Sequence, residues 1–239
     1  MALPRLNETP QYELTIPSTG ELVRYRPFLV KEQKVLIMAL ETQDQRQMLN
    51  AILNCIAACV EDVDIHKLAT FDVEYIFTQV RTKSVGESTT IIVNCEDTNC
   101  EGKTEVKIDL EKVALDTEID HKTKIIKLAQ DIEVELKYPT YHEFLENTQK
   151  DGSAVDMVFA LMGTCISAVI LNDEERIDAK GESAQEVENF INSLNAEQFD
   201  KVRSFVESIP KIKLDIEYAC EDCQKHNKRT LEGLNDFFS

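Results

Sequence analysis

Apolar and polar residues alternate along some segments of the chain and recur at helical spacing along others. Alternation over Tyr12–Ile16 and Glu21–Arg26, on either side of a Pro-Ser-Thr-Gly turn, predicts a β-hairpin. Helical spacing over Val30–Leu40, then after Asp44, and again from Thr70 predicts three helices. The second helix should open at Thr42, because Thr42-Gln-Asp-Gln45 has the spacing of a capping box.

Two strands, Thr89–Asn94 and Thr104–Leu110, are predicted next, and an acidic connector follows from Glu111 to Asp120. Beyond the connector, a similar order of predicted elements recurs. These elements are paired strands at Lys124–Leu128 and Ile132–Tyr138, helices at Tyr141–Gln149, Ala154–Ile170, Val187–Leu194 and after the cap Asn195, and strands at Ile212–Tyr218 and Arg229–Leu231.

The matching order suggests an internal duplication. Pro27 corresponds to Pro139, Cys55 to Cys165, and Cys95 to Cys220. We therefore interpret the chain as an α+β protein of two similar half-domains related by a tandem duplication with a pseudo-two-fold axis. Chance similarity is the alternative, since α+β proteins draw on few element orders. The predicted domains are residues 1–112, with the Cys95/Cys100 turn, a connector at 113–122, and residues 123–239, with the Cys220/Cys223 turn.

Four cysteines form two closely spaced pairs, and each pair lies between two predicted strands. Cys95 and Cys100 have C-x₄-C spacing, and Cys220 and Cys223 have C-x₂-C spacing. Two such turns can supply four thiolates to a tetrahedral Zn²⁺, and C-x₂-C is the stronger signal. We predict a structural, zinc-ribbon-like site that joins the halves, because four thiolates leave no position for water or substrate. The alternative is that the pairs lie apart as surface thiols.

The remaining candidate ligands are less convincing. Cys55, Cys59 and Cys165 lie on apolar helix faces, where cysteine usually packs in the core. His226 could replace a cysteine ligand, although a solvated histidine is the more common case. Gln224 follows Cys223 where zinc ribbons typically have glycine, which departs from the pattern. Nearby cations could offset the charge of four thiolates, namely Lys103, Lys225, Lys228 and Arg229.

The net charge and the absence of known motifs reduce the number of possible functions. The net charge of −18 disfavours nucleic acid and favours a basic protein partner. Neither a signal peptide nor a membrane span is recognisable, so we expect a cytosolic protein with reduced thiols. Seven cysteines, an odd number, also fit a pure disulfide framework poorly. The sequence has no phosphate-binding loop, dinucleotide fingerprint or nucleophile elbow, and we expect no enzymatic activity.

The N-terminal sequence resembles a known family. Met1–Pro4, Tyr12–Gly20 and Arg26–Glu32 resemble the start of the baseplate hub assembly proteins of T-even-type tailed phages, and the turn Asn94–Cys100 continues the similarity. The resemblance implies a non-enzymatic role in contractile-tail morphogenesis in the cytoplasm of the infected bacterium. Phage baseplate hub or tail-tube proteins would be the partners, with no nucleic acid, membrane or small-molecule substrate involved.

Three functions remain open at this point. The protein could be a chaperone-like assembly factor that binds a hub or tail component and then leaves. It could instead be a permanent structural subunit of the baseplate hub in the virion. A zinc-ribbon regulator of transcription is the third, but the charge of −18 disfavours it, and Lys225–Arg229 is a short basic patch.

Overall fold

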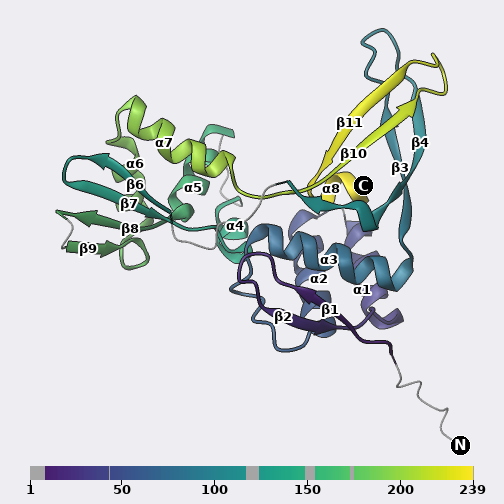
Figure 1. The fold of residues 1–239 in the computed structure, drawn as a ribbon, viewed down its shortest axis with the longest axis horizontal. Coiled ribbons are helices and arrows are strands. Elements are labelled where there is room, and N and C mark those ends of the chain that lie inside the picture. Colours follow the sequence, from purple (N-terminus) through teal and green to yellow (C-terminus); the bar gives the residue numbers. More distant parts are fainter. Residues whose placement is uncertain (1–8, 43, 117–123, 149–153, 173–174, 239) are drawn as a thin grey trace, which may run out of the picture. The chain divides into compact units, whose positions relative to one another are not determined.

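The computed structural model describes residues 9–42, 44–116, 124–148, 154–172 and 175–238. Residues 1–8, which contribute to the family resemblance, and residues 117–123, which include part of the predicted connector, lie outside them. The chain forms two compact units (Figure 1). Unit 1 comprises Met1–Ile65, Phe71–Ile119 and Pro210–Ser239, and unit 2 comprises His66–Thr70 and Asp120–Ile209.

Unit 1 contains a short hairpin, three helices, two longer hairpins and a C-terminal helix. Its elements are β1 (Tyr12–Thr15), β2 (Leu22–Tyr25), α1 (Val30–Thr42), α2 (Gln45–Cys59), α3 (Thr70–Val85), β3 (Ser88–Asn94), β4 (Lys103–Asp109), the 3₁₀ turn η1 (Leu110–Lys112), β5 (Ala114–Leu115), β10 (Ile212–Ala219), β11 (His226–Glu232) and α8 (Gly233–Phe238). The predicted hairpin and helices of this unit are therefore confirmed. The short strand β5 and helix α8 were not predicted.

The second helix begins later than the capping-box spacing indicated. The residue that caps α2 is Asp44, whose carboxylate accepts hydrogen bonds from the backbone N–H groups of Arg46 and Gln47. Thr42 is instead the last residue of α1, where its hydroxyl donates to the carbonyl of Ala39. An aspartate carboxylate is a good helix cap, and it competes successfully with the threonine two residues earlier.

The core of unit 1 is built around α3. Phe71, Val73, Ile76 and Val80 of this helix are almost completely buried. Asp72 is also buried, and its carboxylate accepts hydrogen bonds from the backbone N–H and the hydroxyl of Ser18. A buried carboxylate is tolerated because these donors satisfy it, and the pair attaches the β1–β2 turn to α3.

The two longer hairpins lie side by side (Figure 1). β3 pairs with β4, β10 pairs with β11, and both pairings are antiparallel. Their alternating side chains bury one face of each hairpin, including Ile91 and Val93 on β3 and Ile216 and Tyr218 on β10. The Tyr218 hydroxyl donates to the carbonyl of Asn94, which ties the hairpins together near their tips.

β5 adds a third strand beside β10. The described part of the predicted connector is therefore ordered against the C-terminal hairpin, and Asp116 accepts a hydrogen bond from the Lys211 N–H. Asp116 also pairs with Lys213.

Unit 2 contains a four-stranded antiparallel sheet in the order β6-β7-β8-β9, together with four helices. Its elements are β6 (Lys124–Ala129), β7 (Ile132–Leu136), α4 (Tyr141–Thr148), α5 (Ala154–Cys165), β8 (Ile166–Leu171), β9 (Glu175–Asp178), the 3₁₀ turn η2 (Ala179–Gly181), α6 (Ala184–Asn192) and α7 (Ala196–Glu207). Asn195 caps α7 as predicted, and a capping box with Gln198 forms there.

One helix prediction in unit 2 is wrong. The apolar run Ala154–Ile170 was expected to be a single helix, but α5 ends at Cys165 and the chain continues as β8. The residues from Ile166 onward are rich in β-branched side chains, and pairing with β7 gives their backbone groups hydrogen-bond partners. A continuous apolar run does not by itself distinguish a buried strand from a buried helix.

The units do not coincide with the predicted domains. Residues 210–239 were expected to belong to a C-terminal half starting at 123, but they group with the N-terminal residues in unit 1. Residues 120–209 thus form a unit inserted into the sequence between β5 and β10. β8 and β9 extend the second predicted hairpin into a four-stranded sheet, whereas β1–β2 is a two-stranded sheet among the residues that the structure describes. The internal duplication is therefore not confirmed.

Candidate metal centre

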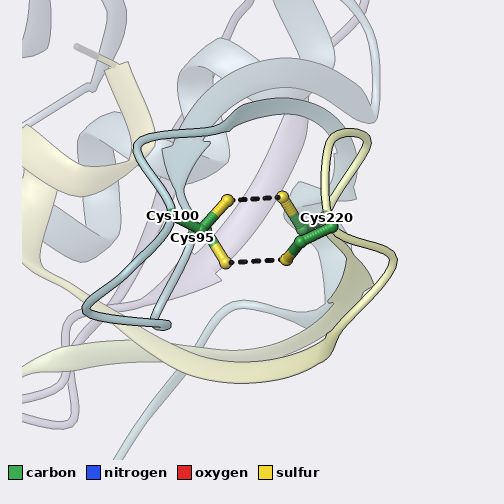
Figure 2. Close-up of side chains that lie close together, drawn as sticks. Cys95, Cys100 and Cys220 are labelled. Carbon is green, nitrogen blue, oxygen red and sulfur yellow. Dashed lines mark hydrogen bonds between the residues drawn. The ribbon is translucent and has the colours of Figure 1, made fainter.

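The four paired cysteines lie in the turns of the two long hairpins. Cys95 follows the last paired residue of β3, and Cys220 follows the last paired residue of β10. We call the segments 95–102 and 220–225 the first and second cysteine turns. Figure 2 shows sulfur atoms of the first turn pointing toward sulfur atoms of the second. The packing of the β10–β11 hairpin against the β3–β4 hairpin thus brings together cysteines that are far apart in the sequence.

The sulfur positions match a tetrahedral metal site. The four Sγ atoms of Cys95, Cys100, Cys220 and Cys223 all lie within 4.8 Å of one another. The Sγ atoms of Cys95 and Cys223 are 3.6 Å apart, and those of Cys100 and Cys220 are 3.8 Å apart. Sulfurs at about 2.3 Å from one zinc ion stand about 3.8 Å apart at the corners of a tetrahedron. A disulfide would need about 2.05 Å, and all seven cysteines are free.

Backbone groups in the first turn point at the sulfur atoms. The N–H of Asp97 lies 3.4 Å from Cys95 Sγ, and the N–H of Gly102 lies 3.4 Å from Cys100 Sγ. The turn is closed by a hydrogen bond of 2.8 Å from the Cys95 N–H to the Gly102 carbonyl. Such N–H groups stabilise negative charge on sulfur, so the turn is already arranged for thiolate ligands.

The second turn is closed in a similar way. The Cys220 N–H donates to the Lys225 carbonyl at 2.9 Å, and the Gln224 N–H donates to the Cys220 carbonyl at 2.9 Å. Gln224 has a φ of 60°, in the left-handed region that favours glycine. Zinc ribbons typically have glycine at this position. Here glutamine adopts the same left-handed backbone conformation.

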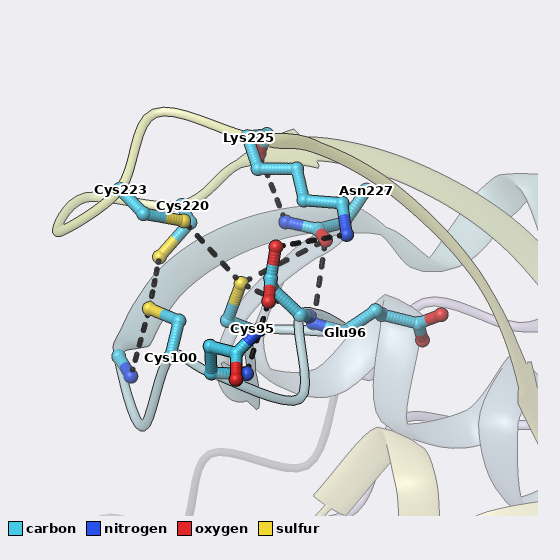
Figure 3. Close-up of polar contacts among 10 residues, drawn as sticks. Cys95, Glu96, Cys100, Cys220, Cys223, Lys225 and Asn227 are labelled. Carbon is cyan, nitrogen blue, oxygen red and sulfur yellow. Dashed lines mark hydrogen bonds and ion pairs between the residues drawn. The ribbon is translucent and has the colours of Figure 1, made fainter.

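Asn227 links the two turns (Figure 3). It is buried at the start of β11, and its Oδ1 atom accepts a hydrogen bond from the Glu96 N–H, while its Nδ2 atom donates to the Lys225 carbonyl. Cys95 Sγ lies 3.9 Å from the same Oδ1 atom. Asn227 was not among the residues predicted for the site, although it lies only four residues after Cys223.

Lys225, one of the predicted cations, is the last residue of the second cysteine turn. It forms an ion pair with Asp97 across the two turns, and Asp97, followed by Cys95 and Cys223, raises its pKa. Two of the other predicted cations pair elsewhere, Lys228 with Glu217 and Arg229 with Asp236.

The thiols differ in acidity. Hydrogen bonding from the Cys223 N–H is the main cause that lowers the pKa of Cys220 to about 7. The Gly102 N–H acts to lower the pKa of Cys100, but desolvation and the neighbouring thiols together raise it to about 12. Four thiolates around one point repel one another, and a divalent cation at the centre would offset that repulsion. The donor set and its spacing fit zinc.

The other candidate residues lie outside the cluster. Cys55, Cys59 and Cys165 are buried, which confirms their predicted core packing. His226 is the exposed first residue of β11 and is not among the clustered ligands in the described residues. No helix in the described ranges is long and apolar enough to cross a membrane.

Gly102 permits the close approach of the two turns. A Cβ atom at this position would lie 2.8 Å from Cys220 Sγ and 2.8 Å from Asp222 Oδ2. We expect Gly102→Ala to lower the free energy of unfolding by about 1–3 kcal/mol, the usual cost of overpacking. It should also weaken zinc retention against a competing chelator.

Gly181→Ala is the matched control, because a Cβ there meets nothing within 4 Å. It should change the unfolding free energy by no more than about 0.5 kcal/mol. Retention of zinc by Gly102→Ala equal to that of Gly181→Ala would contradict the close-approach argument.

Comparison with known proteins gives one match. A family model described as T4 bacteriophage base plate protein matches residues 9–239, which is nearly the whole chain. Searches of the curated proteins and of the solved structures gave no significant match.

Proposed function

The chain belongs to the T4 bacteriophage base plate protein family, and from this premise we propose that it is a baseplate hub assembly factor. In this role it is chaperone-like and non-enzymatic, and it acts during contractile-tail morphogenesis in the cytoplasm of the infected bacterium. The family match over residues 9–239 is the observation that carries the proposal. The match by itself identifies the chain as a phage baseplate protein, and the assembly role is our proposal.

We further propose that Cys95, Cys100, Cys220 and Cys223 bind one structural zinc ion. The support is the cluster of four Sγ atoms within 4.8 Å of one another. Four protein ligands close the coordination sphere, so the ion would have no position for a substrate or an activated water. The zinc would hold the β10–β11 hairpin against the β3–β4 hairpin and so help to fold unit 1.

The charge of the chain suggests how it binds a partner. With a net charge of −18, an acidic surface would attract a basic face of a hub or tail-tube protein. Exposed charges are screened over about 10 Å at an ionic strength of about 0.1 M. Binding to the partner should therefore weaken as salt is added.

Co-expression tests the assembly role. The protein is co-expressed with each hub and tail-tube protein of the same phage, and the partners are assayed by pull-down and by soluble yield. We expect one partner to co-purify, with recovery that falls between low and high salt, or to become more soluble. The chaperone proposal fails if no hub or tail-tube protein co-purifies or gains solubility.

Mass spectrometry of purified virions separates this role from that of a permanent hub subunit. A transient assembly factor should be abundant in the infected-cell lysate and depleted from mature particles. Recovery from particles in stoichiometric amounts would instead assign the chain as a structural subunit of the baseplate.

A further inference from the structure

Helix α1 exposes an apolar face. Its inward side chains Glu32, Leu36 and Ala39 are buried, and the helix packs against α2. Five large apolar side chains on the rest of the helix are between 47% and 79% exposed, namely Val30, Val35, Ile37, Met38 and Leu40. Apolar side chains gathered on one helix are uncommon on a surface that faces only water.

The exposed face has a defined centre. Successive residues of a helix are separated by about 100° around its axis. The buried direction of α1 lies midway between Leu36 and Ala39, and the outward line points the opposite way. Ile37 and Met38 lie about 50° on either side of this outward line. Val35 and Leu40 lie about 110° from this line, on opposite flanks of the helix. The face is thus symmetric about a point between residues 37 and 38.

The charges on this face are also arranged symmetrically, but with opposite signs. Lys34 lies three residues before Ile37, and Glu41 lies three residues after Met38. These two side chains are about 10 Å apart along the axis, too far to pair within one helix. Neither forms an ion pair within the part of the chain that the structure describes. Each has apolar neighbours, Val30 and Met38 for Lys34 and Ile37 for Glu41, one turn away.

We infer that α1 is a self-association surface that binds α1 of a second copy of this chain in antiparallel orientation. A two-fold axis through the point between residues 37 and 38 places Ile37 of one copy beside Met38 of the other, while Val35 and Leu40 lie on the two flanks of the helix pair. It also places Lys34 of each copy opposite Glu41 of the other. One self-complementary surface, used twice, is the usual interface of a two-fold dimer.

Charge complementarity favours a second copy over an unrelated basic partner. The chain as a whole carries −18, which opposes association of two copies over most of their surface. On the α1 face, Lys34 and Glu41 balance each other, and their spacing matches that of an inverted copy. A basic partner would meet Lys34 and the nearby Lys31 with like charge.

The dimer should be weak. The thirteen-residue helix is about 20 Å long, so one pair of helices buries less than the roughly 800 Å² per partner of a standard interface. We therefore expect dissociation in the micromolar range. Sedimentation equilibrium of the full-length, zinc-containing protein in moderate salt measures it, since salt screens the general repulsion.

Ile37→Glu should weaken the dimer by about tenfold or more, because it places acidic groups at the centre of the interface. Ile92→Glu is the matched control, since Ile92 is similarly exposed, at 65%, but belongs to β3 and not to α1. The control should dimerise like the wild type. A wild-type protein that stays monomeric at about 100 μM, well above a micromolar dissociation constant, overturns the inference.

Charge reversal tests the orientation. Lys34→Glu and Glu41→Lys should each weaken self-association, because like charges then face each other at both pairs. Mixing the two variants should restore a dimer, since each copy then presents the charge that the other lacks. The double variant Lys34→Glu/Glu41→Lys should dimerise like the wild type. If the mixture and the double variant stay as dissociated as the single variants, the antiparallel pairing is wrong.

Discussion

Replacing Cys220 with serine is expected to abolish zinc binding and to destabilise unit 1. Cys220 is fully buried, and its Sγ atom lies 3.8 Å from that of Cys100. Serine offers a hydroxyl that is a poor zinc ligand, and the binding free energy of a structural zinc is folding free energy. We expect the free energy of unfolding to fall by more than about 4 kcal/mol, the range reached on loss of a metal site.

Cys165→Ser is the control for this variant. Cys165 is also fully buried, but it lies at the end of α5 in unit 2 and outside the cluster. The Cys165→Ser variant should keep its zinc. Its free energy of unfolding should fall by about 1–3 kcal/mol, because the substitution places a polar group in the core. Denaturant unfolding and elemental analysis measure both effects. The account is wrong if wild-type protein prepared without chelator contains no zinc, or if Cys220→Ser keeps it.

Replacing Glu74 with glutamine should change how stability depends on pH. Glu74 lies on α3, where desolvation by burial raises the pKa of its carboxyl from 4.5 to about 7, against hydrogen bonds from the backbone of Ile212 and Leu234. Between these two values the folded protein holds a proton that the unfolded chain has lost. This carboxyl therefore stabilises the fold fully at low pH, and that contribution is lost as the pH rises through 7.

Glutamine cannot ionise, so the variant should not show this loss. Between about pH 5.5 and about pH 8.5, the stability of Glu74→Gln relative to the wild type should increase by about 2 kcal/mol. Urea unfolding of both proteins at each pH gives the difference, in which contributions from other groups cancel. A difference that stays constant or decreases with pH would show that Glu74 does not ionise in this way.

Local sequence signals predicted much of the secondary structure. The β1–β2 hairpin has alternating residues around a turn with Gly20 at positive φ, and α2 carries apolar residues at helical spacing. Helix α8 escaped prediction because six residues are too short for a periodic pattern. β8 was missed because its apolar run continues that of α5 without a break.

Long-range organisation was harder to predict than the clustering of the four cysteines. The C-x₂-C and C-x₄-C spacings pointed to the four cysteines that the structure brings together. The separation of Cys100 from Cys220 was attributed to duplication, whereas the structure places residues 120–209 in a separate unit between β5 and β10. In the sequence, β4 comes before this insertion and β10 comes after it. No local pattern marks which distant strands pack together. Gly102 and Asn227 were missed for the same reason, because their roles depend on contacts between the two turns.

We propose that one zinc ion joins the two cysteine turns. Zinc-edge X-ray absorption of the purified protein, prepared without chelator, counts the ligand atoms around the metal directly. The account predicts a first shell of four sulfur atoms at about 2.3 Å. A shell that mixes sulfur with nitrogen or oxygen, or the absence of zinc from the protein, would contradict it.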